Sequence, residues 1–109
     1  MSNAELFAAL GDDTRLAVLA RLGEGPASIV RLTESQARDP AQGRAISRQA
    51  LTKHLRVLEK AGLVHQHRAG RESLWSLQRR RLDEARSFLD LMSRRWDDRL
   101  ERLRAMVED

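Results

Sequence analysis

The amino-acid sequence predicts a mainly helical fold with a small β-hairpin and a long C-terminal helix. Three observations predict it. Up to residue 61, apolar residues recur at helical spacing behind capping residues. Two short strand-like runs, 63–67 and 72–77, flank a glycine. Residues 80–109 contain neither proline nor glycine, so we expect them to form one continuous helix.

Length and composition restrict both the fold and the chemistry. The chain has 109 residues, of which 41% are hydrophobic and 33% are charged, so we expect a single domain over residues 1–109. It contains no cysteine, which excludes disulfides, cysteine-based zinc sites and thiol nucleophiles. Its apolar runs are too short to span a membrane, and we expect a cytoplasmic protein.

Three short helices are predicted in the first third of the chain. The first covers residues 4–10 and ends at Gly11. The second is capped by Asp12 or Asp13, and its apolar positions are Leu16, Leu19, Ala20 and Leu22. The third is capped by Ser28 and carries Ile29, Val30 and Leu32. From residue 34 to 45 the apolar pattern is lost, which predicts an exposed loop.

A fourth helix is predicted from Ser47, its N-cap, to about Ala61, with Gly62 as the C-terminal stop. Its apolar stripe consists of Leu51, Leu55 and Leu58. The opposite face carries side chains able to hydrogen-bond bases or phosphates, namely Arg48, Gln49, Thr52, Lys53, Arg56 and Lys60. The two strand-like runs follow, separated by Arg68-Ala69-Gly70-Arg71, so a β-hairpin with a basic tip is predicted.

The last helix has an apolar stripe that advances by three or four residues at a time: Leu82, Ala85, Leu89, Met92, Trp96, Leu100, Leu103 and Val107. So small a domain cannot bury this whole face, and we therefore expect the helix to pair with a second copy of the chain. Packing along its own domain is the alternative. The expected interface consists of Leu6, Phe7, Leu89, Met92, Trp96, Leu100 and Leu103.

Positive charge is concentrated in the middle of the chain. Residues 44–81 carry ten basic and two acidic side chains, whereas residues 1–43 and 82–109 each have a formal charge of −2. Such a block could bind a polyanion, although a merely solvated face is the simpler alternative. The order of helix, turn, polar helix and basic hairpin is that of a winged helix-turn-helix, in which one helix enters the major groove of double-stranded DNA.

Three segments resemble the signature of the ArsR/SmtB family of bacterial repressors: residues 7–16 (FAALGDDTRL), 47–64 (SRQALTKHLRVLEKAGLV) and 70–72 (GRE). The resemblance implies a homodimer that binds a palindromic operator and commonly represses its own operon. Residues 4–78 are then the DNA-binding core, and residues 80–109 the dimerisation helix. The stretch 36–44 is longer than a tight turn. Either the third helix continues to about Ala37, or the segment is mobile and contacts DNA through Arg38 and Arg44, which we favour.

The family's functional positions can be transferred residue by residue. The resemblance implies that Ser47, Arg48, Gln49, Thr52, Lys53 and His54 face DNA from the recognition helix, and that Arg68, Gly70 and Arg71 do so from the wing. Arg15 matches a family Thr-Arg pair that supports the fold or contacts the backbone. Metal-sensing members place cysteines on the third helix, or Asp and His on the last helix. Because this chain lacks both sets, it resembles the subgroup without metal ligands, and no cofactor is expected.

The sequence leaves three alternatives to a DNA-binding protein: a metal site, an enzyme and a protein-binding module. His65 and His67 share a strand face and could hold a metal, but two ligands do not make a site. The acidic pairs Asp12/Asp13 and Asp97/Asp98 do not converge on a substrate, because neighbours on a helix point about 100° apart, so no enzyme is predicted. A winged-helix module that binds proteins instead of DNA is the main alternative, and the charged face argues against it.

Overall fold

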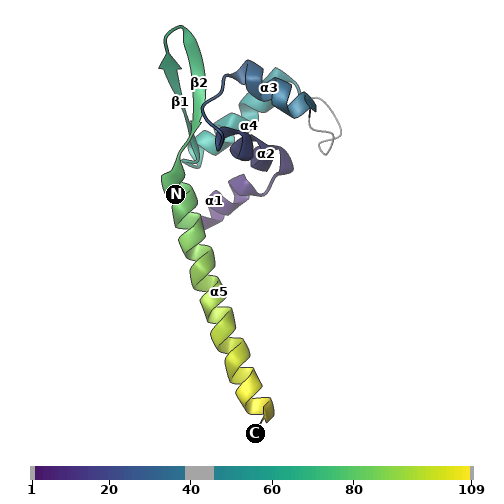
Figure 1. The fold of residues 1–109 in the computed structure, drawn as a ribbon, viewed down its shortest axis with the longest axis vertical. Coiled ribbons are helices and arrows are strands. Elements are labelled where there is room, and N and C mark those ends of the chain that lie inside the picture. Colours follow the sequence, from purple (N-terminus) through teal and green to yellow (C-terminus); the bar gives the residue numbers. More distant parts are fainter. Residues whose placement is uncertain (1, 39–45, 109) are drawn as a thin grey trace.

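The protein consists of a small helical body with a hairpin on one side and one long helix that leaves it (Figure 1). The structure is a computed structural model, and it describes residues 2–38 and 46–108. The elements follow the order α1 (Asn3–Leu10), α2 (Asp13–Leu22), α3 (Ile29–Arg38), α4 (Arg48–Lys60), β1 (Val64–Ala69), β2 (Glu72–Leu77) and α5 (Arg79–Glu108). This order confirms the predicted helical fold with its hairpin and long last helix.

A core of leucines holds the body together. Side chains from all of the first four helices and from the start of the hairpin meet in it, and its largest fully buried members are Leu6, Leu32, Leu51, Leu55, Leu58 and Leu63. The leucine stripe predicted on α4 is therefore the centre of the core. Because the stripe fixes the rotation of α4 about its axis, it also decides which α4 side chains point outward.

The short helices differ from their predictions in two places. In α2 the buried residues are Val18, Leu19 and Leu22, whereas Leu16 and Ala20 are exposed. The predicted loop from residue 34 is wrong up to residue 38, because α3 continues to Arg38 and Gln36 is only 4% exposed. The polar composition hid this last turn of the helix. The alternative that the third helix continues to about Ala37 is therefore confirmed, and Arg38 is the last residue of α3. The mobility and DNA contact proposed for the remaining stretch, through Arg44, fall on residues 39–45, which lie outside the described residues.

The hairpin has an antiparallel register that pairs Ala69 with Glu72, so its turn consists of Gly70 and Arg71. Gly70 has φ +65°, a conformation that favours glycine. The sequence predicted that Arg68 belongs to the turn, but it lies inside β1. A short bridge between Ala27 and Trp75 adds a third extended segment to the hairpin. The segment before α3 is thereby fixed to β2.

Helix α5 gives the molecule its elongated shape. Its thirty residues correspond to a length of about 45 Å, and the protein measures 67 × 29 × 22 Å. Near its start Ala85 is buried against the body, and Phe88 contacts Phe7 of α1 with 5.5 Å between ring centroids. The remainder of the helix extends away from the body (Figure 1). The helix therefore covers the body over its first turns alone.

Candidate nucleic-acid interface

Helix α4 presents a fixed polar face to solvent. Ser47 caps the helix, since its hydroxyl accepts a hydrogen bond of 3.1 Å from the Ala50 N–H. On the side opposite the buried leucines, Arg48, Gln49 and Lys53 are exposed. None of these three side chains hydrogen-bonds or pairs with another residue in the described part of the chain. Their donors and acceptors are thus free to contact a ligand from a rigid backbone.

Thr52 occupies the edge of the same face. Its hydroxyl donates to the Arg48 carbonyl oxygen at 2.8 Å, one turn earlier in the helix. The hydroxyl oxygen still has lone pairs that could accept a hydrogen bond from outside. Thr52 and Ser47 therefore lie on or beside the outward face of α4, and each hydroxyl already makes one hydrogen bond within the helix.

His54 is directed away from this face, toward the beginning of α2. Its Nδ1 lies 3.2 Å from Arg15 Nη1 and 3.9 Å from Asp12 Oδ1, and its side chain is 24% exposed. The structure thus separates His54 from the other α4 residues that the family resemblance assigned to DNA. The resemblance assigned His54 to DNA from its position in the motif. The motif alone does not show that this side of α4 contacts α2.

Arg15 and Asp12 form the rest of this polar cluster. Arg15 Nε and Nη2 donate to the carbonyl oxygens of Ala9 and Ala8 at 2.7 and 3.2 Å, which satisfies the C-terminal end of α1. Asp12 caps α2 by accepting from the Arg15 N–H at 3.0 Å, and this hydrogen bond is the main reason that the pKa of Asp12 is lowered. The cluster joins α1, α2 and α4, as expected for an Arg15 that supports the fold.

The hairpin forms a second basic element beside α4. Arg68 on β1 and Arg71 in the turn are exposed, and neither side chain pairs with another residue among those described. Gln66 Nε2 donates to Ser73 Oγ at 2.6 Å across the strands, below the tip. The three predicted wing residues, Arg68, Gly70 and Arg71, therefore lie together at the end of the hairpin. The hairpin projects from the helical body (Figure 1).

Arg56 extends from α4 toward the hairpin, and its guanidinium already contacts Trp75 and Glu59. Its Cζ lies 5.2 Å from the centroid of the Trp75 ring, and its Nη1 donates to Glu59 Oε1 at 2.9 Å. The sequence placed Arg56 on the DNA-facing side by helical periodicity and did not identify Trp75 or Glu59 as its partners. The i, i+3 spacing of Arg56 and Glu59 was a usable signal for the ion pair. No sequence signal predicts the contact with Trp75.

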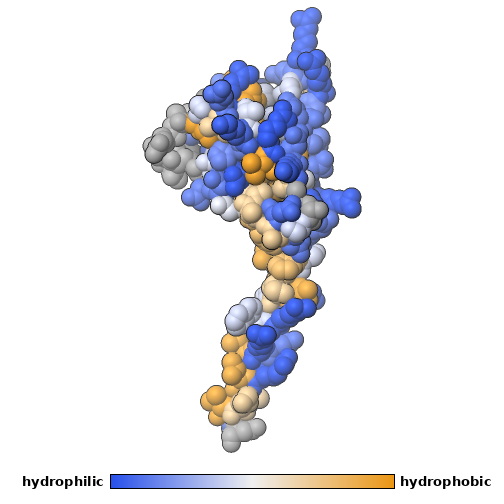
Figure 2. All heavy atoms as spheres, turned by 180° about the vertical axis from the view of Figure 1, so that it is seen from behind, coloured by the Kyte–Doolittle hydropathy of each residue, from blue (hydrophilic) through white to orange (hydrophobic). Residues whose placement is uncertain are grey.

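The residues predicted for a dimer interface separate into two groups. Leu6 is fully buried in the core of its own protomer, so its assignment to an interface is wrong. Phe7 is half-buried against Phe88. The α5 residues form an apolar strip along the part of the helix that leaves the body (Figure 2), with Leu89, Trp96, Leu100 and Leu103 exposed and Met92 partly so.

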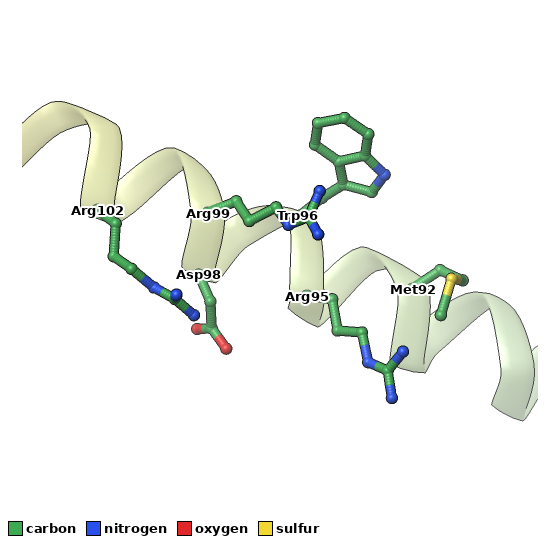
Figure 3. A pocket seen from close by; sticks show the side chains of 6 residues that line it. All are labelled: Met92, Arg95, Trp96, Asp98, Arg99 and Arg102. Carbon is green, nitrogen blue, oxygen red and sulfur yellow. The ribbon is translucent and has the colours of Figure 1, made fainter.

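The same part of α5 carries a shallow hollow of about 450 Å³ beside Trp96. Figure 3 shows that every side chain lining it comes from this one helix: Met92, Arg95, Trp96, Asp98, Arg99 and Arg102. A hollow built on one face of one helix has no opposite wall. It is a surface that a second molecule could cover, and it does not enclose a small ligand.

The described residues contain one histidine pair and no arrangement typical of a metal or membrane site. The rings of His65 and His67 lie side by side with centroids 5.2 Å apart, as their alternation on a strand predicts. Within residues 2–38 and 46–108, no group of three or more His, Cys, Asp or Glu side chains is arranged to hold a metal ion. In the same residues, no helix has both the length and the apolar character needed to cross a membrane.

Comparison with known proteins agrees with this geometry. Residues 10–67 match the family described as a helix-turn-helix domain. The HTH-type transcriptional regulator Rv2034 of Mycobacterium tuberculosis is 38% identical over 82 residues, which cover 75% of this chain and 69% of that protein. These matched residues include α4, whose outward side chains are described above.

Solved structures show the same arrangement. An ArsR-like transcriptional regulator from Rhodococcus sp. RHA1 has a TM-score of 0.76 and 34% identity, with 94% of this chain and 90% of that chain covered. The ArsR family transcriptional regulator RHA00566 has a TM-score of 0.69 and 28% identity, with 86% and 89% covered. The chain therefore belongs to the ArsR family of winged helix-turn-helix, DNA-binding transcriptional regulators, and is not an enzyme.

Proposed function

We propose that the protein is a homodimeric repressor that binds a palindromic operator through α4 and the hairpin wing. The observation that carries the proposal is the outward face of α4. Arg48, Gln49 and Lys53 are exposed there on a helix whose rotation the buried leucines fix. The major groove admits one α-helix and displays edges that distinguish all four base pairs.

Each element has a different part in this binding. Arg48 and Gln49, near the N-terminal end of α4, are suited to bidentate contacts with guanine and adenine edges respectively. Lys53, with Ser47 and Thr52 beside it, supplies phosphate or base contacts. Arg68 and Arg71 of the wing supply charge to the backbone or the adjacent minor groove. Phosphate contacts set affinity and register, and base contacts set sequence preference.

His54 and Arg56 are left out of this contact set. His54 is turned toward Asp12 and Arg15, so its role is to hold α4 against α2. The contact of Arg56 with Trp75 and Glu59 gives it a structural partner on either side. Both residues act on DNA binding through the position of α4 or of the wing.

The apolar strip on α5 supports the proposed homodimer. Leu89, Trp96, Leu100 and Leu103 are each more than half exposed on a helix that extends well beyond its own body. Large apolar side chains in one row are unusual on a monomer surface and typical of an interface. A second copy supplies the same strip, and a two-fold dimer presents two α4 helices to two half-sites about 34 Å apart.

Repression requires that the bound dimer obstructs transcription. We therefore propose that the operator overlaps a promoter in the DNA upstream of this gene, and that the protein acts in the cytoplasm without a metal or other cofactor. Hydroxyl-radical footprinting of that DNA tests the binding mode. Two protected half-sites separated by about one helical turn support the proposal, and a single protected patch contradicts the palindromic dimer.

A further inference from the structure

The side chain of Arg56 connects α4 to the wing. Its guanidinium lies over the ring of Trp75, with 5.2 Å from Cζ to the ring centroid, and donates from Nη1 to Glu59 Oε1 at 2.9 Å. Trp75 is 3% exposed and is the one buried residue of β2, so Arg56 contacts the side chain through which β2 joins the core. A cation over a Trp face is the strongest form of this contact among the aromatic residues.

Trp75 is itself fixed on two sides by its backbone. It pairs with Gln66 of β1 in the hairpin register. Its N–H donates to the Ala27 carbonyl oxygen at 2.8 Å, and its own carbonyl oxygen accepts from the Ala27 N–H at 3.0 Å. A shift of Trp75 would therefore move the whole hairpin relative to the segment before α3. A side chain from α4 that holds this ring also controls where the wing lies.

We propose that Arg56 is a positioning residue that sets the wing against α4, and that it does not contact DNA itself. Two features favour this role over a phosphate contact. Glu59 places a carboxylate at the guanidinium, which lowers its attraction for a phosphate. The guanidinium is also already placed over the Trp75 ring. The inference deepens the proposed DNA-binding function and rests on it.

Replacing Arg56 by lysine separates the two roles, because lysine keeps the positive charge that a phosphate attracts, while its strongly hydrated ammonium is a poorer group to hold over the Trp75 ring than the guanidinium. If Arg56 positions the wing, Arg56→Lys and Arg56→Ala should weaken operator binding to a similar degree, by about 3- to 10-fold. If Arg56 neutralises a phosphate, Arg56→Lys should bind almost like the wild type, which would overturn the proposal. The matched control is Arg86→Lys on α5, the same exchange at an exposed arginine outside the proposed DNA contacts, which should retain affinity.

A double-mutant cycle with Arg71 tests whether the effect passes through the wing. Arg71→Ala should cause a smaller loss of affinity in the Arg56→Ala background than in the wild type, because the wing is already misplaced. In the Lys53→Ala background, Arg71→Ala should cause its full loss. Equal losses in all three backgrounds would mean that Arg56 and the wing act independently, and would overturn the proposal.

A measurement without DNA keeps the test independent of the proposed function. The chain has two tryptophans, so the indole N–H region of an NMR spectrum contains two signals, which Trp96→Phe assigns. Both Arg56→Lys and Arg56→Ala should shift the Trp75 indole signal and leave the signals of the buried leucines unchanged. An unshifted Trp75 signal would overturn the positioning role alone, whereas wild-type protein that binds all DNA equally would overturn the proposed function.

Discussion

Introducing a carboxylate in the middle of the apolar strip on α5 should dissociate the dimer. Leu100 is 56% exposed in the protomer, and both of its neighbours in the strip, Trp96 and Leu103, are exposed as well. Leu100→Asp removes apolar surface that a partner would cover and places a charge in the same position. Because the proposed dimer is two-fold symmetric, every substitution acts twice in it.

The size of the effect can be calculated from the exposure of Leu100. Full burial of a leucine side chain is worth about 1.5–3 kcal/mol. Since only a little over half of Leu100 is exposed and left to bury, each copy contributes about 1–1.5 kcal/mol. Two copies give about 2–3 kcal/mol, which corresponds to roughly a 30- to 150-fold increase in the dimer Kd. Desolvation of the two new carboxylates adds to this value.

Sedimentation velocity over a range of protein concentrations measures the change, and circular dichroism shows whether α5 remains helical. Glu101→Ala is the matched control, because Glu101 is exposed and adjacent residues of a helix point about 100° apart. The control should leave the dimer Kd within a few-fold of the wild type. An undisturbed dimer with Leu100→Asp would refute the assignment of α5 as the interface.

Three further predictions concern DNA binding and stability. Gln49→Ala and Lys53→Ala should weaken operator binding without changing Tm. Gln49→Ala should also relax the base preference at one position and cost about 1–3 kcal/mol of binding free energy. Wild-type specificity in both variants would contradict the role of α4. Arg71→Ala should lower the slope of log K against log salt by about 0.9 for one lost phosphate contact, and an unchanged slope would remove Arg71 from the interface. Asp12→Ala should destabilise the protein by about 1 kcal/mol at neutral pH, because it removes the cap of α2. The pKa of Asp12 is lowered from 3.8 in the folded state, so this stabilisation is present above that pH and is lost as the pH falls through the folded value. Unfolding of Asp12→Asn between pH 7 and pH 3, with Asp13→Asn as the control, should depend less on pH than unfolding of the wild type.

The order of the elements could be predicted from the sequence because local signals and the core agree in this protein. Ser47 caps α4 as predicted, and the stripe of Leu51, Leu55 and Leu58 is fully buried. The prediction failed at the end of α3, where polar residues continue a helix that is held by the core through Leu32 and by the burial of Gln36. Helix ends that depend on such tertiary contacts leave little trace in the apolar pattern.

The candidate site was predictable where it depends on helical periodicity. Arg48, Gln49 and Lys53 face outward simply because the leucine stripe faces inward. His54 and Arg56 belong to the same helix, but their orientations depend on neighbours far away in sequence. His54 lies beside Arg15, which is 39 residues earlier in the chain, and Arg56 contacts Trp75 in strand β2 of the wing. Only the packed structure shows these contacts.

Titration of fluorescently labelled DNA from the region upstream of this gene tests the central claim most directly. The titration is repeated at several salt concentrations and with an excess of unrelated competitor DNA. We predict saturable binding that survives the competitor and weakens steeply with salt, as expected for a specific complex with several phosphate contacts. Binding of equal strength to every sequence would contradict the account of α4 as a reader of base edges.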